Sequence, residues 1–428
     1  PVLHRRGEQD GVEEILIMRK KILIHSLIFS PDGVSTAYLY NDIALKFQER
    51  GFEVVVLTTT PHYNVVSEQL EKQPLKWKIW GLCKESSFHG IKVLHVPQKK
   101  FKNTFLRLLG FIYWHIVSFL LALGQKNIDV ILSPSPPLTL GLLNLWIAKW
   151  KKCKVIYNVQ EIYPDILKLK KGVVLSLLRK IENRVYNESS AVTTIDQIFY
   201  DTIVGRFEDK SKLSVIPNFV DTRLYNPEMG HVEDLDTTLF PVTDSLKLLY
   251  AGNIGFAQDW IPLVNLAERT RDLSVEYFII GEGVMKPYIE EEKKKRGLEK
   301  VHILPYQPRT LMPSILAYSD VQFIFMSPDM EMQGFPSKVY TIMACGKPLL
   351  VCSGKGTPIV NFLQSCNCAE LITEKTLEEK VEKMYHWLQD VSKEQLASMG
   401  RNGMSVIQKQ YSQEIVTDKY VDLVNMLL

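Results

Sequence analysis

Residues 330–351, reading MEMQGFPSKVYTIMACGKPLLV, combine residue types that can hold an anion. The stretch begins as a loop, Pro336 can open a helix at its first turn, and Gly346-Lys347-Pro348 ends that helix. Amides at the start of a helix carry partial positive charge, and Lys338 would add a full charge against phosphate oxygens. The pattern predicts an anion site at the start of a helix over 336–344. The alternative is a solvated lysine on a helix that only covers a sheet.

Three more loops place glycine directly after predicted strands. The first contains Asp32 and Gly33 and opens a helix, where backbone amides favour an anion, although ordinary turn and capping chemistry explains it equally well. The other two lie in the C-terminal half and contain Gly252, Asn253, Gly255, Gly281 and Gly283. Neither completes a dinucleotide fingerprint, which disfavours a hydride-transfer enzyme.

Carboxylates and histidines supply the candidates for proton transfer. Glu161 and Asp165 follow a predicted strand over 154–157, where either could orient a substrate hydroxyl or act as a base. A surface carboxylate at a helix start is the alternative for Glu161. His25 lies inside the first predicted strand and is expected to be a core residue, whereas His62 follows the second strand and has better access to a substrate.

Nothing in the sequence predicts a metal site. Several of the six cysteines lie in apolar stretches, which suits a reducing compartment better than a disulfide framework. Cys366 and Cys368 lack a second ligand pair at zinc spacing, so two ordinary thiols are favoured over a zinc site. No Asp-x-Asp motif is placed to hold a divalent ion.

The candidate residues lie between secondary-structure elements that the sequence predicts. Short β-branched runs alternate with amphipathic segments, and this alternation indicates an α/β fold with parallel sheets. Strands are predicted at 21–29, 53–58, 91–96, 129–133, 154–157, 191–194 and 213–216, then at 246–251, 275–280, 301–304, 321–325 and 348–351. The rhythm occurs twice, which predicts two facing Rossmann-like, doubly wound domains with a cleft at the carboxyl ends of their strands.

A chain of 428 residues exceeds the size at which one core usually stops growing. We place an extended, disordered start at 1–17, an N-terminal domain at 18–220 and a C-terminal domain at 221–412. The last segment, 413–428, is an amphipathic helix that can pack back on the N-terminal domain.

Charge divides unevenly between these halves. Residues 19–220 carry 28 Lys and Arg against 16 Asp and Glu, whereas 221–428 carry 21 against 28, so the first half is expected to face something anionic. The apolar run 108–123 is shorter than the ~20 residues that span a bilayer, so a buried or interfacial helix is expected. Lysines alternate with tryptophans at 76–80 and 149–152, as at a membrane interface. Nucleic acid is a poor explanation, because no recognised binding motif accompanies the charge.

Blocks in this order resemble the retaining GT-B glycosyltransferases of family 4, especially the fucosamine-type aminosugar transferases of capsule, O-antigen and exopolysaccharide assembly. The resemblance rests on the stretch 330–351 and on blocks at 31–33, 49–54, 160–165, 216–221, 250–255, 280–283 and 344–348. It implies that the C-terminal half binds a nucleotide-sugar, most simply a UDP-sugar, with no other cofactor. It also implies that the N-terminal half meets a lipid-linked or saccharide acceptor.

The chain departs from the family pattern at several positions. Gln333 and Thr341 stand where many relatives have two glutamates, the first touching the donor sugar and the second the ribose. Asn253 stands at the position of a common arginine, so Lys338 becomes the candidate for the compensating cation. The same signature carries donor-binding roles over to Gly334, Phe335, Pro336 and Ser337.

The resemblance further implies a front-face mechanism in which a departing phosphate oxygen takes the proton of the acceptor hydroxyl. Fixed N–H dipoles and a lysine would stabilise the charge on the leaving diphosphate. We therefore expect a sugar transferase at the inner face of the bacterial cytoplasmic membrane, working on surface polysaccharide. The rival interpretations are a nucleotide-sugar 2-epimerase and a catalytically silent nucleotide-binding partner of an assembly complex.

Overall fold

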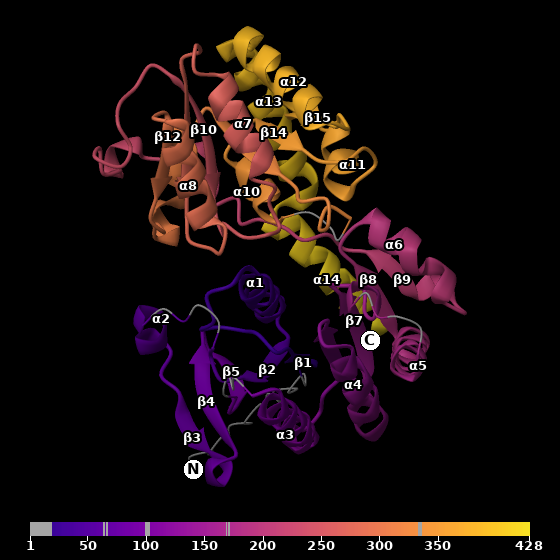
Figure 1. Cartoon of the computed structure of the whole chain (residues 1–428). Coiled ribbons are helices and arrows are strands. Elements are labelled where there is room, and N and C mark those ends of the chain that lie inside the picture. The colour runs from indigo at the N-terminus through magenta and orange to yellow at the C-terminus, as the bar shows by residue number, and fades with distance from the viewer. Residues whose placement is uncertain are drawn as a thin grey trace, which may run out of the picture. The chain divides into compact units, whose positions relative to one another are not determined.

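The computed structural model describes residues 19–62, 65, 67–98, 103–167, 169, 172–332 and 336–428. These residues form two compact units (Figure 1). The first contains the chain up to Asn158, together with Glu188–Ala191 and Leu427–Leu428, and the second contains Val159–Asn187 and Val192–Met426. The predicted start at 1–17 lies outside the described residues.

The first unit contains seven neighbouring strands of a nine-stranded sheet, in the order β3-β4-β5-β2-β1-β6-β7. Neighbouring strands from β5 to β7 run parallel, whereas β3-β4 and β4-β5 are antiparallel pairs. The strands are β1 (Lys21–His25), β2 (Glu53–Thr59), β3 (Lys76–Lys78), β4 (Cys83–Phe88), β5 (Ile91–Val96), β6 (Val130–Pro134) and β7 (Lys154–Val159).

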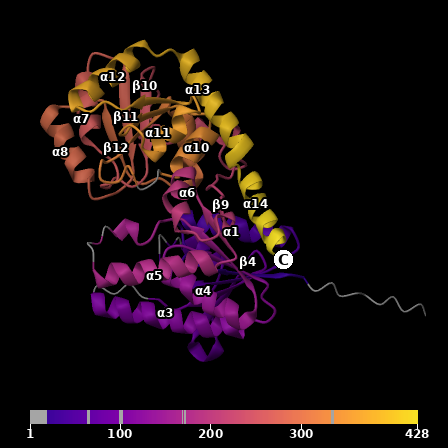
Figure 2. The same cartoon turned by 90° about the vertical axis from the view of Figure 1, so that its right-hand side faces the viewer.

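Helices cover this sheet because parallel strands need crossover connections, which are right-handed. The helices of this unit are α1 (Ser35–Glu49), α2 (Ser67–Lys72), α3 (Thr104–Gly124) and α4 (Leu138–Lys151). From β1 the chain moves through α1 to β2 on one side, and later through α3 and α4 to β6 and β7 on the other. This reversal places α3 and α4 on the same face, where they lie side by side (Figure 2).

The second unit begins with α5 (Val173–Glu188), α6 (Gln197–Ile203) and the parallel pair β8 (Ala191–Thr194) and β9 (Leu213–Val215). Its main sheet is parallel throughout, with the order β12-β11-β10-β13-β14-β15. The strands are β10 (Leu246–Ala251), β11 (Val275–Ile280), β12 (Val301–Leu304), β13 (Val321–Phe325), β14 (Leu349–Cys352) and β15 (Ala369–Ile372).

The strand order reverses between β10 and β13, so this pair marks the topological switch point of the sheet. Buried aliphatic and aromatic side chains pack on both faces of the sheet. The other helices of this unit are α7 (Ile261–Arg269), α8 (Lys286–Arg296), α9 (Met312–Tyr318), α10 (Lys338–Ala344), α11 (Pro358–Gln364), α12 (Leu377–Asp390), α13 (Lys393–Val406) and α14 (Gln413–Leu427).

The predicted strands are present, with small shifts at some ends. The first ends at His25 rather than at 29, because the Ser26 hydroxyl bonds the carbonyl oxygen of Ile28 and bends the chain. The antiparallel pair β3-β4 and the edge strand β15 were missed. The predicted helix start at Pro336 was also wrong, since α10 begins at Lys338.

Candidate functional site

The loops that follow β10 and β13 are bonded to one another at the switch point of the second unit. Asp259 N donates to Phe325 O at 2.8 Å, and Ser327 N donates to Ala257 O at 3.1 Å. Between them, the Gln258 side chain accepts from Phe325 N at 3.1 Å. In doubly wound sheets, ligands bind outside the carboxyl ends of the strands at this point, so these loops form the candidate site.

Lys338, the first residue of α10, reaches the end of β10. Its amino group donates to Ala251 O at 2.8 Å and lies 3.7 Å from the centroid of the Tyr250 ring. The Tyr250 ring is in turn held in place, because its hydroxyl donates to Asn253 O at 2.8 Å. The amino group of Lys338 therefore lies directly beside the glycine loop that contains Gly252.

Removal from water lowers the pKa of Lys338 to about 7. Among the described residues, no carboxylate lies within ion-pair distance of this amino group. Its contacts are a carbonyl oxygen and an aromatic face, which hold a cation less firmly than a paired carboxylate does. An arriving anion would therefore both gain a strong partner and favour the protonated amine.

The two glycine loops of this unit lock together through their backbones. Gly252 N donates to Ile280 O, and Ile254 N donates to Glu282 O, both at 2.9 Å. A Cβ on Gly281, whose φ is +143°, would lie 2.0 Å from Gly252 O, and one on Gly283 would lie 2.2 Å from Ile254 O. Gly281 and Gly283 thus have a packing reason to be glycine, apart from any ligand.

Gly252 and Asn253 are the exposed residues of the first loop, whereas Gly255 is buried. A Cβ on Gly255 would lie 2.8 Å from the amide nitrogen of the Asn253 side chain. The Gly255 carbonyl accepts from the Trp260 indole nitrogen at 3.1 Å. The loop is therefore held in place at the buried Gly255, and it is exposed at Gly252, where Lys338 approaches it.

Glu331, which was not predicted from the sequence, anchors the loop after β13. Its carboxylate accepts from Gly354 N at 2.7 Å and from the Ser353 hydroxyl at 3.1 Å, both in the loop after β14. A signal was present, since Glu331 is the only acidic residue in the stretch 330–351. We infer a positioning role, because the loop that it holds leads into Lys338.

The remaining residues of the signature lie around the start of α10. Val339 N bonds the carbonyl of Pro336, Ser337 is exposed, and Thr341 is half-buried on the helix. Gln333, Gly334 and Phe335 lie outside the described residues. Their predicted contacts with the donor sugar stay predictions.

The two candidate carboxylates after β7 have different surroundings. Burial raises the pKa of Glu161, which makes its carboxylate a stronger base than an exposed glutamate. Asp165 instead forms ion pairs with Arg179 at 2.6 Å and Arg206 at 2.7 Å. Both arginines also pair with the buried Glu182, so Asp165 belongs to a structural ion-pair network.

Asp32 and Gly33 belong to the first unit, in the loop that precedes α1. Asp32 is buried, and one of its carboxylate oxygens accepts from His62 N at 2.8 Å, which joins the loops after β1 and β2. His25 is fully buried, bonds Asn144 at 2.7 Å and has a pKa lowered to about 4 by burial. It therefore stays neutral at physiological pH, as expected of a core histidine.

Cys366 and Cys368 are both buried thiols. Among the residues that the structure describes, no group of three or more His, Cys, Asp or Glu side chains is arranged to hold a metal ion.

Known families cover most of the chain. Residues 37–224 match Glycosyltransferase Family 4, and residues 236–406 match Glycosyl transferases group 1. A putative colanic acid biosynthesis glycosyl transferase, WcaI of Escherichia coli (strain K12), is 23% identical over 348 residues, which are 76% of this chain and 81% of WcaI. A probable glycosyltransferase, WbjE of Pseudomonas aeruginosa, is 22% identical over 70% of this chain and 75% of its own length.

Solved structures share the fold at low sequence identity. The crystal structure of Anabaena HepE in complex with UDP has a TM-score of 0.70 and 15% identity, and covers 95% of this chain and 100% of HepE. At this identity the likeness establishes the architecture, which is two parallel-sheet α/β domains of the GT-B type. The reaction has to be inferred from the residues of the site.

Proposed function

The chain is a glycosyltransferase with the GT-B fold, and we propose that it transfers a hexose or an N-acetylated aminosugar from a UDP-sugar with retention of configuration. The acceptor in this proposal is a lipid-linked or growing saccharide in bacterial surface polysaccharide biosynthesis. The name of WcaI and the UDP bound to HepE support these choices of pathway and donor.

One observation carries the proposal, which is the position of the Lys338 amino group at the switch point. It lies where the carboxyl end of β10 meets the exposed Gly252, 2.8 Å from Ala251 O. When a nucleoside diphosphate leaves an anomeric carbon, negative charge grows on its phosphate oxygens, and a cation already bound to those oxygens stabilises that charge. Lys338 is the donor-side catalytic residue in this account.

The amine also suits this role because its protonation responds to the ligand. With a pKa of about 7 in the unliganded protein, it becomes fully charged when phosphate oxygens replace the carbonyl of Ala251 as its partner. Gly252, Asn253, Thr341 and the segment from Gln333 to Ser337 complete the proposed donor site. We assign the diphosphate to Lys338 and Gly252, the ribose to Thr341 and the sugar to Gln333.

Glu161 is the proposed acceptor-side group. Its raised pKa allows it to orient an acceptor hydroxyl or to accept that hydroxyl's proton, although a departing phosphate oxygen can take the same proton. Asp32 and Gly33 remain proposed contacts of the first unit with substrate.

A lipid-linked acceptor requires docking at a membrane, and α3 offers an apolar surface for it. Only 28% of its most apolar 18-residue window is buried, and it is long and apolar enough to cross a membrane by length and composition alone, which is weak evidence of spanning. Its exposed stripe repeats every fourth residue, at Leu108, Ile112, Ile116 and Leu120, and each of these side chains is 45–57% exposed. We propose that this stripe lies in the membrane interface.

The neighbouring helix α4 extends this surface with features typical of an interface. Trp146 and Trp150 are exposed, at 45% and 75%, beside the exposed Lys149. Neither α3 nor α4 contains an acidic residue. Tryptophan at the headgroup level and lysine beside anionic lipid both favour binding.

The function is tested by incubating the purified protein with UDP-sugars and a polyprenyl-diphosphate-linked saccharide, and analysing products by mass spectrometry. We expect transfer of one sugar, release of UDP, and an α-configured linkage from an α-linked donor by NMR. Isomerisation of the donor without acceptor would instead identify an epimerase. UDP binding without sugar transfer to the polyprenyl-diphosphate-linked saccharide would favour a catalytically silent nucleotide-binding protein.

A further inference from the structure

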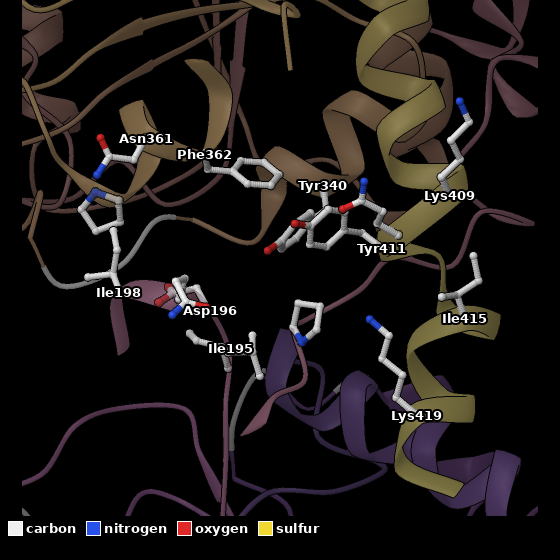
Figure 3. Close-up of a pocket in the computed structure, with 15 residues that line it drawn as sticks. Ile195, Asp196, Ile198, Tyr340, Asn361, Phe362, Lys409, Tyr411, Ile415 and Lys419 are labelled. Atoms are coloured by element: carbon white, nitrogen blue, oxygen red, sulfur yellow. The ribbon is translucent and has the colours of Figure 1, made fainter. Parts of the chain in front are cut away.

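A cavity of about 510 Å³ opens in the second unit (Figure 3), and Lys338 is not among the residues that line it. The residues that define its character are Asp196 before α6, Tyr340 on α10, Asn361 and Phe362 on α11, Tyr411 before α14 and Lys419 on α14. Its volume lies in the range of small-molecule sites, which is roughly 300–1,000 Å³. Lys338 and Tyr340 lie two residues apart on α10, so they project from different sides of that helix.

Three aromatic rings form one wall of this cavity. The Tyr340 and Tyr411 rings stack, with centroids 5.1 Å apart, and Phe362 meets them nearly edge-on, 5.7 Å from Tyr340 and 5.4 Å from Tyr411. Rings held by one another in this way present a fixed apolar surface. The C–H groups on the face of a pyranose ring pack well against such a surface.

Polar groups surround the aromatic wall. Asp196 and the Asn361 amide lie on its border, and they can bond sugar hydroxyl groups. One oxygen of Asp196 already accepts from Phe199 N at 2.7 Å, which fixes the orientation of the carboxylate. Burial raises the pKa values of the Tyr340 and Tyr411 hydroxyls, so both stay neutral at physiological pH.

Lys419 brings a positive charge to the cavity. It extends from α14 toward the space below the rings (Figure 3). Among the described residues, it has no hydrogen-bond or ion-pair partner. An ammonium group that forms no ion pair among the described residues, beside a rigid aromatic surface, favours a ligand with a ring and an acidic group.

We propose that this cavity is a second ligand site, which binds an acidic saccharide. The pyranose ring lies against Tyr340, Phe362 and Tyr411, and its carboxylate or phosphate group pairs with Lys419. The site is separate from the donor site and does not depend on the proposed function.

Binding is measured by isothermal titration and by saturation-transfer NMR on the full chain, with UDP present in excess to occupy the donor site. The probes are glucuronic acid, glucose 6-phosphate, glucose and uridine. We expect both acidic sugars to bind saturably, with signal transferred to their ring protons, and glucose to bind about tenfold more weakly. The variant Lys419→Ala should reduce the affinity for the acidic sugars to that for glucose.

Two further variants serve as controls. Lys393→Ala removes an exposed lysine of α13 outside the cavity and should leave all affinities unchanged. Phe362→Leu should lower the affinities for acidic and neutral sugars to the same extent. Melting temperatures establish that each variant is folded. The proposal is overturned if no sugar binds saturably, if Lys419→Ala leaves binding unchanged, or if uridine binds in preference to the sugars. UDP affinity, measured separately, reports on the donor site independently of these results.

Discussion

The Lys338 amino group fills the space that any side chain at Gly252 would need, because a Cβ there would lie 2.4 Å from Nζ. A cation and an exposed backbone are thereby brought together at the end of β10. A diphosphate that approaches Gly252 meets this amine first.

Protonation of Lys338 should be linked to binding of UDP. At pH 8 the amine, with a pKa of about 7, is mostly neutral without ligand, and bound phosphate raises its pKa, so a proton is taken up on binding. Calorimetric titrations in buffers of different ionisation enthalpy should reveal this uptake at pH 8 and much less of it at pH 6. Affinity should fall as the pH rises above 7. Equal proton uptake by Lys338→Met would contradict the assignment.

Replacing Lys338 by Met should reduce kcat/KM by about 100-fold or more, because the leaving diphosphate loses its cation. The melting temperature should not fall, since an amine with a depressed pKa gives way to an apolar chain of similar length. Lys347→Met is the matched control, because Lys347 is also half-buried and its amino group donates to two carbonyl oxygens away from the glycine loops, Ala317 O at 2.9 Å and Ser319 O at 2.8 Å. That variant should lose stability and keep its UDP affinity. If both variants lose UDP affinity to the same extent, the role of Lys338 is structural.

Gly281→Ala should destabilise the second unit by ~2–4 kcal/mol, because its Cβ would collide with the backbone oxygen of Gly252 at 2.0 Å. Urea unfolding measures the change. Gly205→Ala, where no atom lies within 4 Å of the new Cβ, should change stability by less than about 0.5 kcal/mol. Equal stability of the two variants would show that the loops are not locked together.

The triple variant with Ile112, Ile116 and Leu120 each changed to Ser should lose binding to phosphatidylglycerol vesicles, measured by co-sedimentation. Each position is 45–57% exposed, so folding and UDP affinity should be preserved. Val242→Ser, at a residue 95% exposed in the second unit, is the control. If the triple variant still co-sediments fully with the vesicles, α3 does not bind the membrane.

Most strands were predictable because buried parallel strands are short, β-branched and bounded by turns. The matches at 91–96, 191–194, 246–251 and 275–280 are of this kind. The β3-β4 pair was missed because its first strand, Lys76–Lys78, is wholly exposed and has no apolar face to reveal its period. Its lysines and Trp77 were interpreted as a membrane-interface cluster instead.

The site was predictable in its residues more than in its contacts. Sequence pattern predicted that Lys338 lies near a helix start and that the glycine loops follow strands, since helix starts and strand ends carry local signals. The bonds from Lys338 to Ala251 O and from Glu331 to Gly354 N join segments 87 and 23 residues apart. Such contacts depend on the order of strands in the sheet, which periodicity does not encode.

The most direct test of the donor site is a crystal structure of the chain with bound UDP or a UDP-sugar. The account predicts that the Lys338 amino group leaves Ala251 O and lies about 3 Å from a phosphate oxygen beside Gly252. A complex in which that amine still bonds Ala251 O, with the diphosphate bound elsewhere, would contradict it.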